Sequence, residues 1–315
     1  MQNYRQYGIP MKLAFTCLLL FIPLNSIAGQ IAFTFDDAPM GDSAVMSGQQ
    51  RTDRLIKAIK SAAIPDALFF VKADAIDASG DKRLKQYIQA GFHLANHSYA
   101  HQSANKIPVN AFLIDAYTAH LKLKNYSNVL PYFRFPYLHY GQDAAAIDAL
   151  QAGLLELGYQ NGYVTVDNFD WYMNALLNNA KKDGKAIDYE KFGALYVEVI
   201  WQAIVFYDEL AVKTLGRSPK HVLLLHENDT AALFLAKLAR HIRQQGWEII
   251  TPQQAYSDPI AAELPVTHFH KQGRIAAMAN AKGTSESLLR HPAENQQYLD
   301  KLFKDGGVFG DKSPP

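Results

Sequence analysis

The stretch IAFTFDD at residues 31–37 is an apolar, aromatic and β-branched run that ends in two acids. A short run of this composition predicts a buried strand. Six similar runs follow it, at 67–72, 92–96, 132–135, 162–166, 221–225 and 247–250. Segments with helical periodicity separate them, for example 52–63, 82–90, 109–123, 144–157 and 231–244. About seven alternations of strand and helix predict an α/β fold whose parallel sheet closes, or nearly closes, into a barrel.

One segment is longer than this alternation requires. Apolar residues recur with helical spacing from 188 to 216, so we expect one long helix there, with 174–185 as its approach. We interpret 174–216 as a helical insertion within a catalytic domain of residues 29–256. The tail at 257–315 is polar and lacks clear periodicity, and we expect it to wrap the surface or to be partly disordered.

The N-terminus has the layout of a secretory signal peptide. Residues 11–30 read MKLAFTCLLLFIPLNSIAGQ, in which one lysine precedes an apolar run and a small-residue exit ending at Ala28. The run is too short to span a membrane comfortably, although an uncleaved anchor is the alternative. Either Met1 or Met11 is the true start. We therefore expect residues 1–28 to be removed and the mature protein to be secreted or periplasmic.

The charge and cysteine content exclude several kinds of site. The chain has 31 Lys and Arg against 30 Asp and Glu, so no basic footprint argues for nucleic acid. Loss of residues 1–28 removes Arg5, Lys12 and the single cysteine, Cys17. Without thiols, the mature protein cannot use disulfides, a cysteine nucleophile or thiolate metal ligands. Any metal must be held by histidine and carboxylate.

Reactive side chains follow five of the predicted strands. In parallel α/β folds, functional groups collect in the loops at the carboxyl ends of strands. The residues at these ends are Asp36 and Asp37, His97 and His101, Arg134 and Tyr137, Asp170 and Trp171, and His226. Because these strand ends share one rim, the sequence predicts one common site.

Two histidines and one acid of this set can form a metal site. His97 and His101 are four residues apart, so a helical turn would place both imidazoles on one face. With one carboxylate they form a three-ligand site that leaves positions open for water and substrate. Adjacent side chains at a strand end point in different directions. We therefore expect Asp37 to bind the ion and Asp36 to act as general base on the attacking water. The alternative interpretations are an ordinary surface pair for the two histidines and a turn or helix cap for the two acids.

The five strand ends also carry a family resemblance. In order, TFDD (34–37), HSYAH (97–101), RFPY (134–137), DNFDW (167–171) and LLLHE (223–227) resemble the five motifs of the polysaccharide deacetylases, the NodB-homology family or carbohydrate esterase family four. The resemblance extends from about residue 31 to 252. It implies a distorted (β/α) barrel and one divalent metal, often zinc, with cobalt, nickel, manganese or iron as other possibilities.

The resemblance also implies a role for each motif residue. Asp36 would be the base, and Asp37, His97 and His101 the metal ligands. Arg134 would hold the base carboxylate, and the backbone N–H of Tyr137 would help to stabilise the oxyanion. His226 would be the general acid, oriented and kept protonated by Asp170. Trp171 and Leu224 would line the acetyl pocket.

The chain departs from the family pattern at several points. Ala38 stands where glycine usually follows the acids, and Leu138-His139-Tyr140 precede Gly141 after the third motif. The insertion could cover one end of the groove, and substrate choice is expected to depend on these departures. Outside the motifs, His268 and His270 are expected in a solvated loop, and His93 is expected to be a packed or rim residue.

These patterns predict a secreted, metal-dependent deacetylase that hydrolyses the acetamido groups of an N-acetylated glycan, such as peptidoglycan or chitin-type oligomers. One alternative is O-deacetylation of acetylated xylan, which the same residues could perform. A second is a non-catalytic glycan-binding domain. A third, a metal-dependent hydrolase of small cyclic amides, would need a more enclosed pocket, and the signal peptide argues mildly against it.

Overall fold

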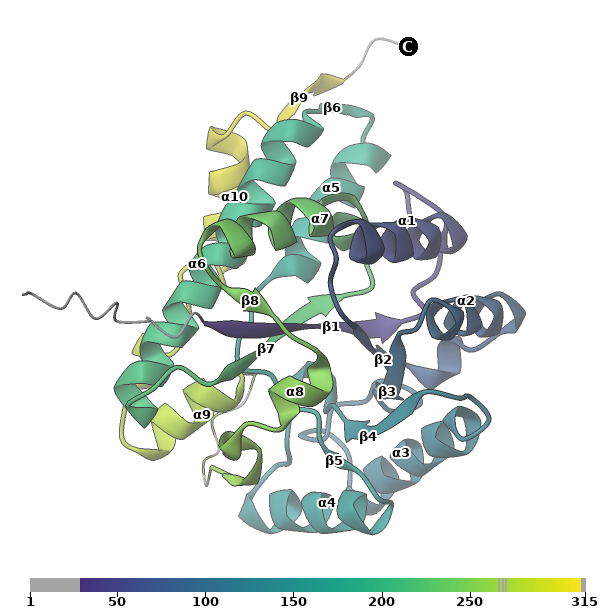
Figure 1. Ribbon diagram of the computed structural model, residues 1–315, viewed down its shortest axis with the longest axis vertical. Coiled ribbons are helices and arrows are strands. Elements are labelled where there is room, and N and C mark those ends of the chain that lie inside the picture. Colours follow the sequence, from purple (N-terminus) through teal and green to yellow (C-terminus); the bar gives the residue numbers. More distant parts are fainter. Residues whose placement is uncertain (1–28, 266, 268, 270, 313–315) are drawn as a thin grey trace, which may run out of the picture.

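The computed structural model describes residues 29–265, 267, 269 and 271–312 (Figure 1). The predicted signal peptide, His268 and His270 lie outside the described residues. None of the helices within these described ranges has the length and apolar character needed to cross a bilayer.

A parallel sheet of seven strands forms the centre of the molecule. The strand order is β5-β4-β3-β2-β1-β7, and β8 also pairs with β1. The bounds are β1 (Gln30–Ala38), β2 (Leu68–Val71), β3 (His93–Asn96), β4 (Val129–Phe133), β5 (Gln160–Asn161), β7 (Lys220–His226) and β8 (Glu248–Ile249). The sheet curls into a half-barrel with helices around it, so the predicted fold class is confirmed (Figure 1).

Strand β1 fixes the relative positions of the strands that carry reactive residues. Its Ile31, Phe33 and Phe35 side chains are fully buried, as expected for a central parallel strand that is covered on both faces. β1 pairs with β7 in a continuous register in which Asp36 lies opposite His226. Two residues predicted to carry out acid–base chemistry therefore lie on neighbouring strands, at the same end of the sheet.

Helices surround the sheet. They are α1 (Gly48–Ser61), α2 (Ala78–Gln89), α3 (Val109–Leu123), α4 (Ala144–Glu156), α5 (Asp170–Lys182), α6 (Tyr189–Leu215), α7 (Asp229–Gln244), α8 (Pro252–Tyr256), α9 (Arg274–Ala281) and α10 (Gln296–Asp305). Side-chain caps begin several of them, including a capping box at Ser47 and an Asn228 cap on α7. The five periodic segments from the sequence all coincide with helices.

The expected strand at 162–166 is largely absent. Only a single bridge, between Val166 and Leu223, lies in this range, and the short strand β5 precedes it. The Thr165 hydroxyl accepts a hydrogen bond from the Val222 backbone N–H at 2.8 Å and contacts His221 Nδ1 at 3.0 Å. The Thr165 side chain thus occupies the Val222 N–H, which would donate to a backbone carbonyl in a regular β-ladder. This interrupts the strand pairing.

The long helix predicted at 188–216 is present as α6. The Asp188 carboxylate caps its N-terminus, and Gly216, with a φ of 77°, ends it. Most of the predicted approach, 174–185, is part of α5, and β6 (Lys185–Ile187) joins the two helices. α6 packs against α7 and α9.

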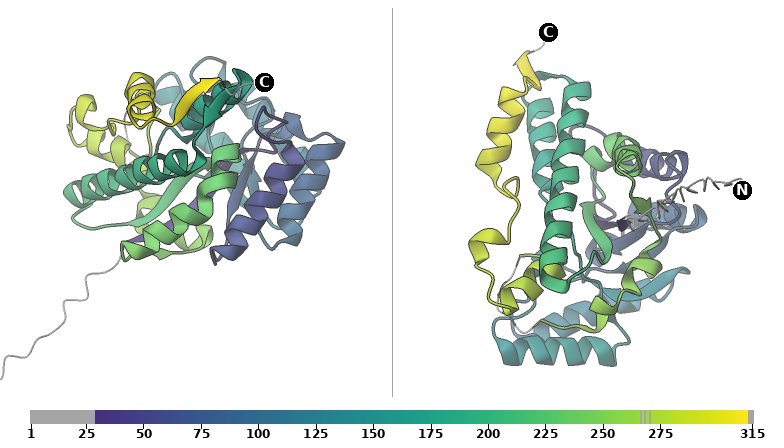
Figure 2. Two further views of the ribbon diagram at one scale, coloured as in Figure 1. Left: turned by 90° about the horizontal axis from the view of Figure 1, so that it is seen from above. Right: turned by 60° about the vertical axis from the view of Figure 1, so that its left-hand side comes forward.

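The C-terminal tail has more structure than the sequence suggests. It contains η3 (Pro259–Ala262), α9, η4 (Glu286–Leu288), α10 and β9 (Phe309–Lys312), and β9 pairs antiparallel with β6. Ile275, Leu289, Leu299 and Phe303 are fully buried in the main hydrophobic core. Figure 2 shows the tail (yellow) running along α6. The expectation of partial disorder is wrong for the described residues. Their apolar side chains are scattered in the sequence, but in the fold they lie in one cluster with side chains of α6.

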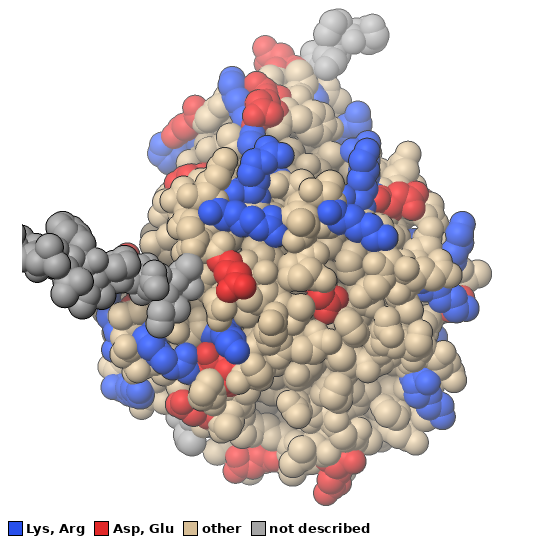
Figure 3. All heavy atoms as spheres, in the orientation of Figure 1, with Lys and Arg blue, Asp and Glu red and all other residues tan. Residues whose placement is uncertain are grey.

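Acidic and basic side chains are interspersed on the face of the molecule shown in Figure 3. This distribution agrees with the nearly balanced formal charge of +1. The visible surface therefore gives no support for a nucleic-acid footprint.

Candidate metal centre and active site

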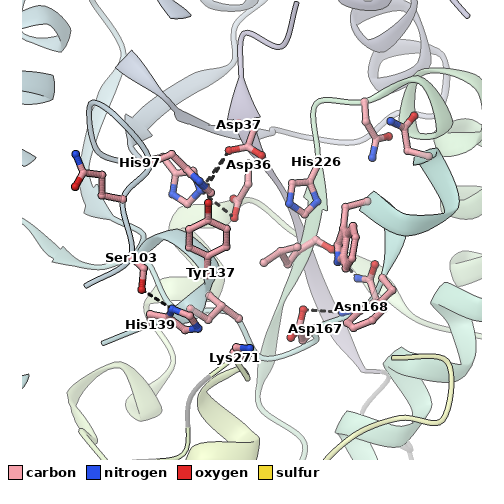
Figure 4. A pocket seen from close by; sticks show the side chains of 18 of the residues that line it. Asp36, Asp37, His97, Ser103, Tyr137, His139, Asp167, Asn168, His226 and Lys271 are labelled. Atoms are coloured by element: carbon pink, nitrogen blue, oxygen red, sulfur yellow. Dashed lines mark hydrogen bonds and ion pairs between the residues drawn. The ribbon is translucent and has the colours of Figure 1, made fainter. Parts of the chain in front are cut away.

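The carboxyl ends of the strands surround a pocket of about 900 Å³ (Figure 4). Eight of the ten predicted site residues line it: Asp36, Asp37, His97, His101, Tyr137, Trp171, Leu224 and His226. The other two, Arg134 and Asp170, are buried behind the lining and contact Asp36 and His226. The structure therefore brings all ten together.

Asp37, His97 and His101 form the candidate metal centre. One ligand atom from each lies within 4.8 Å of the other two. Asp37 Oδ1 is 3.3 Å from His101 Nε2 and 3.7 Å from His97 Nε2. This buried oxygen has no hydrogen-bond partner among the residues that the structure describes. An unsatisfied buried carboxylate oxygen facing two imidazole nitrogens fits a cation site.

The protonation of both histidines suits metal binding. His97 Nδ1 lies 2.8 Å from the carbonyl oxygen of Arg134, which can only accept a hydrogen bond, so Nδ1 carries the proton. This leaves the Nε2 lone pair facing Asp37, as a metal-ligating histidine requires. Burial, with a further contribution from His97, lowers the pKa of His101 to about 4. A cation between these atoms would satisfy the lone pairs of both imidazoles and of the Asp37 carboxylate.

The loop that carries the two histidines is not the helical turn expected from their spacing. Residues 97–101 have no helical assignment, and Ser98 and His101 have positive φ angles of 70° and 53°. The Asp115 carboxylate on α3 accepts hydrogen bonds from the backbone N–H groups of Tyr99 and Ala100, at 2.9 and 3.0 Å. The loop therefore brings the imidazoles together through hydrogen bonds to a neighbouring helix.

Asp36 is held by the buried Arg134 side chain. Arg134 Nη1 donates a 2.6 Å hydrogen bond to Asp36 Oδ1, while Asp36 Oδ2 lies 3.7 Å from His97 Nε2. Burial would lower the pKa of Arg134, but the Asp36 carboxylate outweighs it and raises that pKa above its usual value. One Asp36 oxygen is thus committed to the guanidinium, and the other faces the metal centre.

Arg134 is itself fixed in place on several sides. It donates hydrogen bonds to the Gly162 carbonyl, the Thr34 hydroxyl and the Tyr256 hydroxyl, at 2.8, 2.9 and 2.9 Å. Its guanidinium carbon also lies 3.8 Å from the centre of the Phe70 ring. Asp36 therefore has a nearly fixed orientation.

The backbone turns between the two acids. Asp37 has a φ of 64°, so the chain leaves the extended conformation at this residue, and one oxygen of each carboxylate lies 3.7 Å from His97 Nε2. Acidic residues tolerate this left-handed conformation better than most. Ala38 does not have a positive φ, so the absence of glycine there carries no conformational penalty.

His226 and Asp170 form a second charged pair across the pocket. His226 Nδ1 lies 2.7 Å from Asp170 Oδ1, and the His226 backbone N–H donates to Asp170 Oδ2 at 2.8 Å. Burial lowers the pKa of His226, but the Asp170 carboxylate more than compensates and raises it to about 10. His226 therefore carries a proton at neutral pH, with its Nε2 side available to the pocket.

Aromatic and apolar side chains complete the walls. Tyr137 is 55% exposed, and its ring packs edge-on against His101 at 4.5 Å between ring centres. Trp171, at the start of α5, is 39% exposed. Leu224 forms a small apolar cluster with Leu138 and Val164. These residues suit a small apolar group such as a methyl, and they leave two aromatic faces open to a ligand.

Several pocket residues were not predicted. Lys271, Arg290 and Gln296 come from the tail, whereas none of the residues that line the pocket, in the part of the chain described, comes from α6. The helix at 188–216 therefore does not line the pocket, whereas Asn174, at the start of the predicted insertion, does, and the tail contributes a further wall. The Ser103 hydroxyl contacts His139 Nδ1 at 2.7 Å, which places one departure from the family pattern in the pocket. Neither arrangement has a signal in the local sequence.

Residues outside the pocket have structural roles. His93 lies at the start of β3, with its Nδ1 atom 2.8 Å from Asp66, and is a partly buried residue as expected. Glu227 accepts hydrogen bonds from Arg83 and Tyr87, at 2.6 and 2.7 Å. These contacts brace the loops around His226.

The family model for polysaccharide deacetylase matches residues 25–156. These residues are similar to the polysaccharide deacetylase family. They carry the first three motifs, with Asp36, His97 and Arg134, whereas Asp170 and His226 lie beyond the match. No curated protein has a matching sequence.

Solved structures of the polysaccharide deacetylase family resemble the chain at low sequence identity. A family 4 carbohydrate esterase from Streptomyces lividans in complex with acetate is 22% identical, with a TM-score of 0.48, over 72% of this chain and 95% of that one. A peptidoglycan deacetylase from Bacillus subtilis is 19% identical, with a TM-score of 0.47, over 73% and 90%. A CE4 family pseudoenzyme from Bacillus anthracis is 14% identical, with a TM-score of 0.52, over 73% and 66%. The similarity to the pseudoenzyme, at 14% identity, shows only a shared fold.

Proposed function

We propose that the protein is an exported, metal-dependent hydrolase that removes acetyl groups from an N-acetylated glycan. The observation that carries this proposal is the buried, unpartnered Oδ1 of Asp37 between two imidazoles, with Asp36 and His226 on the same pocket. Because a pseudoenzyme has a similar fold, the argument depends on these side chains rather than on the fold. The sequence of residues 1–28 supports export.

Asp37, His97 and His101 would hold the metal. Histidine and carboxylate ligands suit zinc, and also cobalt, nickel, manganese or iron. When bound, the ion would lower the pKa of water and polarise the acetyl carbonyl group. The neutral form of His101 and the fixed Nδ1–H of His97 keep the ligand lone pairs available at neutral pH.

The remaining residues would carry the proton transfers. Asp36 accepts a proton from water as the water oxygen bonds to the acetyl carbon, and Arg134 keeps the carboxylate aimed at that oxygen. The Tyr137 backbone N–H stabilises the negative oxygen that develops. His226 donates a proton to the sugar nitrogen as the carbon–nitrogen bond breaks, which yields acetate and a free amine. Trp171 and Leu224 enclose the methyl group.

Acetate release from N-acetylglucosamine oligomers, with and without a chelator, tests the proposal. We expect release that stops on complete metal removal and returns when the metal is restored. Asp36→Asn should lower turnover by about 10²- to 10⁴-fold, the usual contribution of a general base, with metal content unchanged. Asp148→Asn, an exposed acid on α4, is the matched control and should behave as wild type.

The same experiment separates the alternatives. Activity that survives complete metal removal would contradict metal dependence. Acetate released from acetylated xylan but not from the oligomers would indicate an O-deacetylase. Oligomer binding with no acetate release from any glycan would indicate a non-catalytic binding domain, which Asp36→Asn would then leave unaffected.

A further inference from the structure

The tail forms a wall of the pocket, and this wall carries cations. Lys271 and Arg290 line the pocket from the tail, and Lys106 lines it from the segment that precedes α3. In Figure 4, Lys271 lies near His139, on the far side of the pocket from Asp37. Lys271 is therefore separate from the candidate metal centre.

The backbone of Lys271 is held at a defined position. It has a φ of 63°, which side chains other than glycine seldom adopt without support. Its N–H donates a 3.2 Å hydrogen bond to the Leu138 carbonyl, and its carbonyl accepts a 3.4 Å hydrogen bond from Arg290 Nη1. One contact anchors the wall to the loop of the third motif, and the other anchors it to a second cation.

The two lysines of the pocket are not paired with its acidic residues. Within the part of the chain that the structure describes, neither Lys106 nor Lys271 forms an ion pair. Asp36 is paired with Arg134, and Asp37 belongs to the metal centre. Burial, together with the nearby Glu294, raises the pKa of Asp167 well above its usual range, which favours the uncharged form of this carboxyl group. Lys106 and Lys271 thus bring positive charge to the pocket that no ion pair among the described residues neutralises.

We propose that the pocket is built for an acidic N-acetylated glycan, in which Lys271 pairs with a carboxylate on a sugar near the one that loses its acetyl group. This inference rests on the proposed function and adds a substrate class to it. A carboxylate could come from a uronic acid or from a lactyl ether on an amino sugar, and Lys271 would recognise both through the same charge. Arg290 positions Lys271 and adds to the local potential.

The test compares acids with their uncharged counterparts. The substrates are oligosaccharides that alternate N-acetylglucosamine with glucuronic acid, others that alternate it with N-acetylmuramic acid, and the methyl esters of both. The metal-loaded protein should show a higher kcat/KM for each acid than for its ester. Lys271→Gln should reduce this preference about two- to fivefold, the effect of an exposed ion pair, and Lys271→Arg should restore it. High salt should reduce the preference of the wild type.

The control variant is Lys57→Gln, which removes an exposed cation on α1 and should keep the wild-type preference. A preference limited to one acid would identify the source of the carboxylate. Equal kcat/KM for acids and esters, or an unchanged preference in Lys271→Gln, would overturn the inference while the deacetylase function stood. If the wild type released acetate from none of them, the proposed function would fail, and calorimetric binding of the same acids and esters would still decide the role of Lys271.

Discussion

At the scale of single residues, the environment of His226 controls its charge. The Asp170 carboxylate holds the pKa of His226 at about 10, against about 6.5 for a histidine in an unfolded chain. A group whose pKa is higher in the folded state contributes stability that is complete below the unfolded pKa and is lost as the pH rises through the folded pKa. We expect the free energy of unfolding of the metal-free protein to lose this contribution between about pH 6.5 and about pH 10.

Chemical denaturation at a series of pH values measures this effect. His226→Gln should flatten the decline across that window, because the variant has no proton to lose there. His120→Gln is a suitable control, since His120 lies on α3 away from the pocket. Equal pH dependence in wild type and His226→Gln would contradict the assignment of the raised pKa to His226.

At the scale of elements, the loop that carries His97 and His101 depends on α3. Asp115 accepts two backbone hydrogen bonds from this loop, and its loss leaves two donors without a partner. Outer contacts of this kind typically contribute about 10- to 100-fold in metal affinity. We expect Asp115→Ala to weaken metal binding by about that factor, measured by competition with a chromogenic chelator.

Asp148→Asn on α4 again serves as the control and should bind metal as wild type. A circular dichroism spectrum would show whether Asp115→Ala remains folded. Unchanged metal affinity in a folded Asp115→Ala protein would show that the loop keeps its shape without the two hydrogen bonds to Asp115.

Comparison of these elements shows what the sequence can and cannot predict. Asp36, Asp37 and His226 were predictable because a short apolar run ending in a polar residue marks the end of a strand, and parallel strands end together. The shape of the 97–101 loop was not, since the spacing of two histidines allows either a helical turn or a loop held from outside. Asp115 is a buried acid on a largely apolar helix, and this is the one local signal that could have identified it.

At the scale of the whole molecule, the tail is part of the hydrophobic core. Phe303 on α10 is fully buried and packs against Phe192 of α6, with 4.7 Å between ring centres. We expect Phe303→Ala to lower the free energy of unfolding by about 3–5 kcal/mol, the usual cost of removing a buried aromatic ring. Urea denaturation of the full chain measures this change.

Tyr298→Ala is the matched control on the same helix, because the Tyr298 side chain is 46% exposed and should cost far less. Equal destabilisation by both variants would contradict the packing of α10 against α6. The structure of the tail could not be predicted from its own sequence, because its few apolar residues follow no regular spacing. Their burial depends on α6, the helix against which they pack.

The pairing of β1 with β7 has a consequence for how this protein can diverge. Asp36 and His226 occupy opposed positions in one continuous register. Inserting or deleting one residue within either strand would turn every side chain beyond that point to the other face of the sheet. A change of length in the loops or in the tail leaves this register intact, whereas a change of length within either strand does not. The wall of the pocket can therefore vary independently of the separation between Asp36 and His226.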